Sequence, residues 1–172
     1  RRGSSVAFAG FFAAAAAWAG CDKPVYLTLD TGHMGVAPLV AEVLKRQDVR
    51  ATFFLANERT LNGGTSLDDQ WAPWWRERAA EGHAFGSHTW DHDSWLADTP
   101  CGLKLRFSQG SQAGHVCVLD AAGYCAELER SAQRFKAITG QALSSLFRVP
   151  GGKTSPALLK AAAGCGWTHV GW

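Results

Sequence analysis

Residues 83–92 have the sequence H-A-F-G-S-H-T-W-D-H, in which a short apolar stretch leads into two histidines four positions apart. We expect residues 83–87 to form a short strand and the chain to enter a helix after it. On a helix, His88 and His92 would lie on one face, within reach of a single metal ion. Neutral imidazoles suit zinc and similar divalent ions. A histidine pair alone is a modest signal, because chance and core packing explain most isolated pairs.

Polar residues also stand at the ends of other predicted strands. Residues 25–29, expected to form a buried strand, are followed by Asp30, and the strand predicted at residues 143–148 ends in Arg148. Taken singly, each residue has a plainer explanation. A strand-end aspartate commonly caps a turn, and an arginine before a Pro-Gly turn is commonly solvated. Their common position at strand ends is what favours a shared site.

Strands and helices alternate along the chain, which predicts an α/β fold with a parallel sheet or barrel. Sites in such folds lie at the carboxyl ends of the strands, so we expect Asp30, His88 and Arg148 to converge. Residues 100–120 have weak periodicity and several Gly, Ser and Gln residues, and are predicted to be an inserted loop. Helices are predicted at residues 37–45, 69–81, 121–138 and 155–163, the last two ended by Gly140 and Gly164, with further strands at 51–55 and 167–172.

Composition places the chain among globular proteins and gives no sign of a nucleic-acid partner. Of its 172 residues, 47% are hydrophobic and 19% charged, which is enough apolar content for one substantial core. The net charge of +2 is weak, and the chain has no Lys/Arg block. Packing accounts for most of the eight tryptophans, and some could stack on sugar rings.

The first 20 residues have the features of a signal peptide. Arg1 and Arg2 precede a short apolar run at residues 6–18, and residues 17–19 fit a small-residue cleavage site. An alternative is a lipoprotein signal with Cys21 as the lipidated residue, which would be the only link to a membrane. Both interpretations predict export to the periplasm or the extracellular space.

Export makes the later cysteines candidates for disulfide bonds. These are Cys101, Cys117, Cys125 and Cys165, and four thiols allow three complete pairings, among which the sequence does not choose. No two of them have the C-x-x-C spacing of a structural zinc site. Free buried cysteines are an equally good interpretation.

Three segments, in their order along the chain, resemble the motifs of the polysaccharide deacetylases of carbohydrate esterase family 4, the NodB-homology domain. Thr28–Gly32, T-L-D-T-G, is similar to the first motif, T-F-D-D-G. His88–His92 matches the second, H-[ST]-x-x-H, and Glu81 begins its usual lead-in, E-G-H-x-x-G-x-H. Arg148–Gly152 matches the third, R-x-P-x-G. The resemblance runs from Pro24 to the last residue.

The resemblance implies a distorted (β/α) barrel of the NodB-homology type over residues 21–172, truncated at its C-terminus. The family's late L-x-H motif, which supplies an acid histidine, has no counterpart before Trp172. We therefore expect the chain to be a fragment. Its missing initiator methionine and its end within an apolar run agree with this expectation.

The implied activity is metal-dependent removal of N-acetyl groups from a peptidoglycan- or chitin-like glycan. Asp30 would be the general base and Arg148 would orient it. His88 and His92 would hold a divalent metal, zinc in the first place, with cobalt or a similar ion as an alternative. Pro150 and Trp172 would contact the glycan.

One departure from the family pattern affects the metal site. Thr31 stands where the first motif has its second aspartate, and a hydroxyl does not replace the charge of a carboxylate. The metal would keep extra waters, or another group would serve as ligand; the candidates are Glu58, His33, Asp91 and Asp93. This departure keeps two alternatives open: a glycan-binding protein of the same fold without catalysis, and a hydrolase of another non-peptide C–N bond.

Overall fold

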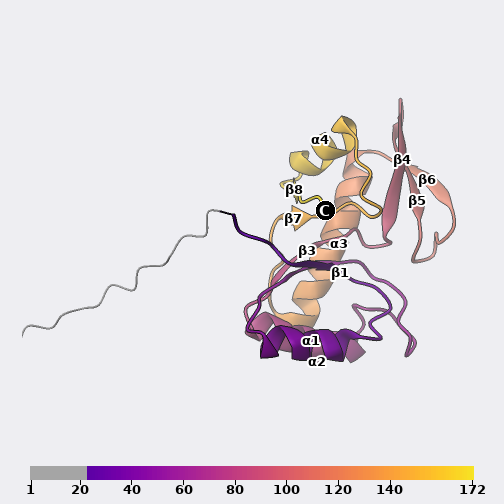
Figure 1. Cartoon of the computed structure of the whole chain (residues 1–172). Coiled ribbons are helices and arrows are strands. Elements are labelled where there is room, and N and C mark those ends of the chain that lie inside the picture. Colours follow the sequence, from indigo (N-terminus) through magenta and orange to yellow (C-terminus); the bar gives the residue numbers. More distant parts are fainter. Residues whose placement is uncertain (1–22) are drawn as a thin grey trace, which may run out of the picture.

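The computed structural model describes residues 23–172 and places a parallel β-sheet at the centre of the molecule (Figure 1). Its strands are β1 (Thr28–Asp30), β2 (Thr52–Leu55), β3 (Ala84–Ser87), β7 (Leu146–Phe147) and β8 (Thr168–His169), in the order β1-β2-β3-β7-β8. All four neighbouring pairs are parallel, which confirms the predicted α/β class. The predicted barrel is not closed within this part of the chain. The predicted signal peptide and Cys21 lie outside the described residues.

The first strand is shorter than predicted and begins later. Val25 and Tyr26 are 95% and 79% exposed and precede β1, so the expectation of a buried strand from residue 25 is wrong. Apolar content alone suggested that strand, but the ladder to β2 pairs only from Thr28 onward. The strands predicted at residues 143–148 and 167–172 likewise shrink to two residues each.

The helices match their predicted positions closely. They are α1 (Ala37–Arg46), the 3₁₀ turn η1 (Asp69–Trp71), α2 (Ala72–Ala80), α3 (Ala121–Thr139) and α4 (Pro156–Gly164). The carboxylate of Asp120 caps α3 by accepting from the Gly123 N–H at 2.7 Å, and Gly140 ends it in the left-handed conformation. Gly164 does not cap α4, because it is the last helical residue and the left-handed turn falls on Gly166.

The predicted loop at residues 100–120 is instead most of a second sheet. This antiparallel sheet consists of β4 (Asp93–Thr99), β5 (Gly102–Phe107) and β6 (Val116–Leu119). Leu103, Leu105 and Phe107 of β5 are buried while the residues between them are exposed, the alternation of a strand with one covered face. Figure 1 shows this sheet beside α4, at the opposite end of the molecule from α1 and α2.

An aromatic cluster joins the parallel sheet to the helices. Phe85 of β3 lies with its ring centroid 5.8 Å from that of Phe53 and 4.6 Å from that of Phe135 on α3. Trp75 of α2 is fully buried against the same rings, and its indole N–H donates to the Ser66 carbonyl at 2.7 Å. Core packing therefore explains Trp75, as composition suggested for most tryptophans.

A disulfide bond joins Cys125 of α3 to Cys165 after α4, and Cys101 and Cys117 have no disulfide partner within residues 23–172. The structure thus selects one bridge among the pairings that the sequence left open. No helix in residues 23–172 has both the length and the apolar content needed to cross a bilayer.

The aromatic cluster generates a stability prediction. Phe135→Ala would leave a cavity between α3 and the sheet, because the ring is fully buried. We expect it to lower the free energy of unfolding by about 3–5 kcal/mol. Leu39→Ala on α1, where the side chain is 58% exposed, is the control and should change it by less than about 0.5 kcal/mol. Urea unfolding followed by tryptophan fluorescence measures both, and equal losses would contradict this account of the core.

Candidate active site

The sequence-predicted residues Asp30, His88 and Arg148 converge at the carboxyl edge of the parallel sheet. Asp30 ends β1, His88 follows β3 and Arg148 follows β7. The strand register explains the convergence, because Ser87 pairs with Phe147 and the next residues therefore leave the sheet at the same level. The edge thus gathers a carboxylate, an imidazole and a guanidinium.

Arg148 is only 1% exposed, and its guanidinium makes both hydrogen bonds and ring contacts. Its Nη1 donates to Asp30 Oδ1 at 3.1 Å, and its Nη2 donates to Thr28 Oγ1 at 2.8 Å and to the Gly171 carbonyl at 2.9 Å. The guanidinium also lies over the rings of Phe54 and Trp172, at 4.4 and 4.5 Å from their centroids. A buried charge with this many partners has a single position, so it fixes the orientation of Asp30.

Asp30 keeps one oxygen free. Its Oδ2 is buried without a hydrogen-bond partner and lies 3.6 Å from Nε2 of His88. Burial raises the pKa of Asp30, and the Arg148 charge and hydrogen bond only partly offset that effect. A carboxylate with a raised pKa and an unpaired oxygen is suited to accept a proton.

His88 is fixed in one tautomer. Its Nδ1 lies 2.9 Å from the Arg148 carbonyl oxygen, which can only accept, so Nδ1 carries the proton and the lone pair is on Nε2. Burial, together with the nearby His92 and Arg148 charges, lowers the pKa of His88 to about 3. The ring is therefore neutral at neutral pH, which is the form that binds metals.

His92 lies near His88, but no helix connects them. Residues 88–92 form a loop that leads into β4, so the expectation that the chain enters a helix is wrong. Thr89 and His92 have φ angles of 57° and 52°, in the left-handed region, and these angles turn the loop so that the two imidazole centroids are 5.0 Å apart. His88 and His92 are therefore close together, as helical spacing predicted, but a loop and not a helix brings them together.

Ser108, which sequence analysis missed, orients His92. Its hydroxyl donates to the His92 carbonyl at 2.9 Å, so its oxygen accepts from Nδ1 of the same residue at 2.6 Å. The lone pair of His92 is then on Nε2, as in His88. Burial also lowers the pKa of His92. Ser108 follows β5 in the segment predicted to be a loop, and no local pattern marks it.

Glu127 of α3, also missed, anchors the His88–His92 loop. Its carboxylate accepts from the Asp91 N–H at 2.9 Å, and its carbonyl accepts from the Trp90 N–H at 3.0 Å. Arg130 donates to the other carboxylate oxygen at 2.8 Å and lies over the Trp90 ring. A left-handed non-glycine residue persists only where the surroundings hold it, and α3 provides that support.

The four candidate replacements for the missing second aspartate have other contacts. Asp91 and Asp93 are buried beside Glu127, and His33 accepts from the Gly35 N–H at 3.0 Å. Glu58 comes nearest to the role, since the Thr31 hydroxyl donates to its Oε1 at 2.9 Å. Burial and, to a lesser extent, the charge of Asp30 raise the pKa of Glu58 to about 7, although the hydrogen bond from Thr31 lowers it.

The donors present fit part of a metal site. The imidazoles of His88 and His92 each have a free Nε2, and the unpartnered Asp30 Oδ2 lies beside one of them. Within residues 23–172, however, no three His, Cys, Asp or Glu side chains come together closely enough to form a complete ligand set. The two histidines therefore fit as ligands.

The two residues predicted to contact a glycan differ in accessibility. Trp172 is 78% exposed, and its ring stacks on the Arg148 guanidinium. Pro150 is buried, which leaves it little surface for a ligand. Glycan contact at both positions stays a prediction.

Comparison with known proteins places residues 19–170 within a family model described as polysaccharide deacetylase. The chitin deacetylase of Colletotrichum lindemuthianum is 38% identical over 76 residues, covering 42% of this chain and 29% of that protein. The peptidoglycan-N-acetylglucosamine deacetylase PgdA of Listeria monocytogenes is 35% identical over 72 residues, covering 41% and 14%.

Solved structures give the same fold. The crystal structure of the Colletotrichum enzyme matches with a TM-score of 0.61 and 25% identity, over 87% of this chain and 56% of that one. A carbohydrate esterase family 4 pseudoenzyme of Bacillus anthracis matches with a TM-score of 0.56 and 18% identity, over 86% and 43%, and shows the fold alone. The chain spans less than two thirds of the length of each of these proteins.

Burial of the Glu58 carboxyl, which raises its pKa, generates a pH prediction. The folded state holds the Glu58 proton up to about pH 7, whereas the ordinary pKa is 4.5, so the folded state binds more protons between these values. Glu58 therefore lowers the free energy of unfolding as the pH rises through this window. In Glu58→Gln that decline should be absent. The free energy of unfolding of the variant, compared with that of the parent protein, should therefore be higher at pH 8 than at pH 4.5. Urea unfolding at both pH values, with a chelator present, measures the difference; identical pH profiles would contradict the raised pKa.

Proposed function

Since the chain belongs to the polysaccharide deacetylase family, we propose that it carries the catalytic base and metal-binding histidines of an N-deacetylase acting on a peptidoglycan- or chitin-like glycan. The observation that carries this proposal is the Asp30 carboxylate, with one oxygen fixed by Arg148 and the other free beside Nε2 of His88. Core packing alone gives no reason to leave a buried carboxylate oxygen unpaired at this place.

His88 and His92 would hold a divalent metal through their Nε2 atoms, with Asp30 beside them. Zinc is the first choice for two neutral imidazoles, and cobalt or a similar ion is the alternative. When bound, such an ion polarises an acyl oxygen and lowers the pKa of water toward 7.

The chain's own residues account for the rest of the base chemistry. Asp30 takes a proton from the attacking water at Oδ2, while Arg148 keeps Oδ1 in place and limits rotation of the carboxylate. The Arg148 carbonyl and Ser108 set the tautomers of the two histidines, so that both lone pairs are free for the metal. Trp172, whose ring stacks on Arg148, would contact a sugar next to this edge.

Substrate and location follow as parts of the same proposal. Relatives are named as deacetylases of chitin and of peptidoglycan, both N-acetylated glycans. Such polymers lie outside the cytoplasm, and the signal-like residues 1–20 support export, with Cys21 as a candidate lipid anchor.

A glycan-binding protein without catalysis is the second candidate function. Thr31 favours it, because the site has one carboxylate fewer than the family motif and no three-residue ligand set within residues 23–172. A pseudoenzyme among the proteins of the same fold gives a precedent for loss of activity. Metal-dependent acetate release separates the two candidates.

The direct test is acetate release from N-acetylglucosamine oligomers by the protein at its natural length. We expect release to stop with a chelator and to return when zinc is added, because the histidines would lose and regain the ion. Release that continues at full rate in the chelator would refute metal dependence. No release from any acetylated glycan, with zinc shown to be bound, would favour the glycan-binding candidate.

The contacts of Arg148 predict how its role can be separated from metal binding. Arg148→Lys keeps the positive charge but loses the forked contacts to Asp30 and Thr28, so the base is less well oriented. We expect kcat to fall about 100-fold while bound zinc, measured by atomic emission, is unchanged. His88→Gln is the matched comparison and should lose the metal itself. Loss of zinc in Arg148→Lys would show that the arginine acts on the metal site instead.

A further inference from the structure

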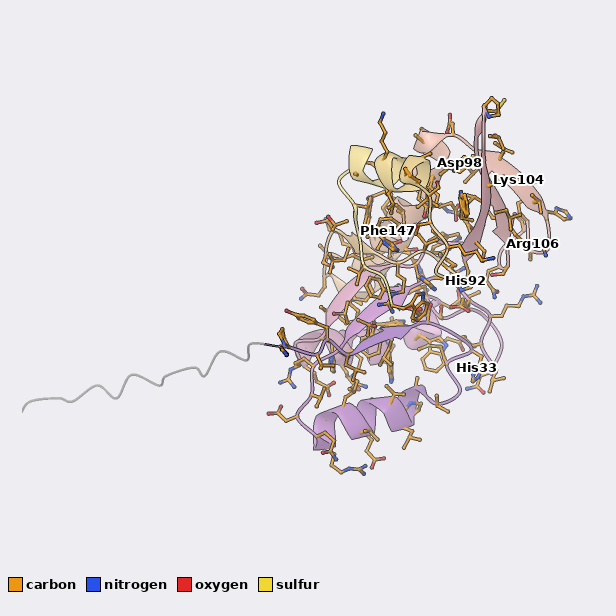
Figure 2. The ribbon with its side chains drawn as sticks, turned by 45° about the horizontal axis from the view of Figure 1, so that its top comes forward. His33, His92, Asp98, Lys104, Arg106 and Phe147 are labelled. Carbon is orange, nitrogen blue, oxygen red and sulfur yellow. A yellow bond between two sulfur atoms is a disulfide. The ribbon has the colours of Figure 1, made fainter. Side chains whose placement is uncertain are left out.

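The outer face of the β4–β6 sheet carries two cations in line with the candidate active site. Lys104 and Arg106 are exposed on β5, and the alternation of the strand continues to Ser108, which is exposed directly after it. Ser108 contacts Nδ1 of His92 at 2.6 Å, so the row ends at a predicted metal ligand. Given the rise per residue of a β-strand, the backbone positions of Arg106 and Lys104 are about 7 and about 14 Å from that of Ser108. Figure 2 shows Lys104, Arg106 and His92 following one another down this side of the molecule.

These two cations have no acidic partner. Neither takes part in an ion pair within the described residues 23–172. The residues directly across from them on the neighbouring strands are Ser94, Ala97, Val116 and Val118. Asp98 of β4 is opposite Leu103 and accepts hydrogen bonds from Trp95 and Ser155. The face therefore has positive charge that nothing in the sheet neutralises.

A third cation lies on the loop that follows β2. Arg59 follows β2 and is exposed, and its backbone N–H donates to the Gln109 side chain at 3.2 Å. Gln109 in turn donates from its backbone to the Asp91 carbonyl at 3.0 Å, which ties this loop to the His88–His92 loop. Like the other two, Arg59 has no ion-pair partner within residues 23–172.

The acidic groups near this rim do not cancel its charge. Asp91, Asp93 and Glu127 are buried behind the loop, and Arg130 pairs with two of them. Asp30 is paired with Arg148. Glu58, the residue before Arg59, is half-buried and accepts a hydrogen bond from Thr31. Lys104, Arg106 and Arg59 are therefore left without a paired carboxylate, although the whole chain has a net charge of only +2.

We propose that Lys104 and Arg106, together with Arg59 on the loop after β2, form a subsite for carboxylate groups of an acidic glycan, next to the sugar that loses its acetyl group. This proposal rests on the proposed function and narrows its substrate class from N-acetylated glycans in general to those bearing carboxylates. A guanidinium recognises a carboxylate through two parallel hydrogen bonds, and an unpaired cation breaks no existing ion pair when it binds one. A neutral glycan can accept hydrogen bonds from these side chains but gains no ion pair from them.

The test compares binding of two probes to the protein at its natural length, by calorimetry. One probe alternates N-acetylglucosamine with the carboxylated N-acetylmuramic acid, and the other is a neutral N-acetylglucosamine oligomer of the same length. We expect the acidic probe to bind more tightly, and Lys104→Gln with Arg106→Gln to weaken it about tenfold while affinity for the neutral probe stays the same. The preference should shrink as salt is raised.

Matched variants separate charge from structure. Lys160→Gln removes another exposed cation, one that lies on α4 and is not part of the β4–β6 sheet, and it should change nothing. Lys104→Arg with Arg106→Lys keeps both charges and should retain the preference. Equal affinity of the parent protein for both probes, or an unchanged preference in the double glutamine variant, would overturn the subsite.

Acetate release from each probe is measured separately, so that the two proposals can fail independently. Preferential binding of the acidic probe without acetate release would contradict the proposed function and support the subsite. Acetate release from both probes without a binding preference would contradict the subsite and support the proposed function.

Discussion

The buried ion pair between Arg148 and Asp30 is the interaction on which the rest of the site depends. Arg148 follows β7 and Asp30 ends β1, with β2 and β3 between these strands. Strands three steps apart in a sheet are separated by about 14 Å, so the two side chains must reach toward each other across the edge of the sheet to form the salt bridge at 3.1 Å. The Arg148 guanidinium lies over the ring of Phe54 on β2, between the two strands. The ion pair thus has a role in the proposed function and also links β1 to β7 across β2 and β3.

Much of this arrangement could be predicted from sequence because its determinants are local. Apolar stretches ending at Asp30, His88 and Arg148 mark parallel strands, and the carboxyl ends of such strands share one edge. The path from His88 to His92 could not be predicted, because its left-handed residues are not glycines and are held by Glu127, a contact distant in sequence. Ser108 was missed for the same reason. The pairing of Cys125 with Cys165 likewise depends on how α3 packs against α4.

The error at residues 100–120 has a different cause. The alternation of β5 is regular, but it lasts only from Leu103 to Phe107 and is flanked by Gly, Ser and Gln residues that are typical of loops. A strand of six residues gains its stability from neighbours on both sides, here β4 and β6. Ser108, which contacts His92, follows β5 of this sheet, and the unpaired cations lie on β5. The segment predicted to be a loop therefore contributes to both proposals.

Thr31 sets the electrostatic character of the site. Its hydroxyl is neutral, and it donates to Glu58, whose pKa of about 7 leaves that carboxyl partly protonated near neutral pH. The charge of Asp30 is already shared with Arg148. A cation bound by His88 and His92 would therefore be surrounded by less negative charge than in a site with two aspartates, and it would bind more weakly. The same deficit would leave more positive charge on the ion and would strengthen its polarising effect on an acyl oxygen. Loss of the second aspartate would thus lower the affinity for the metal without lowering the polarising power of a bound ion.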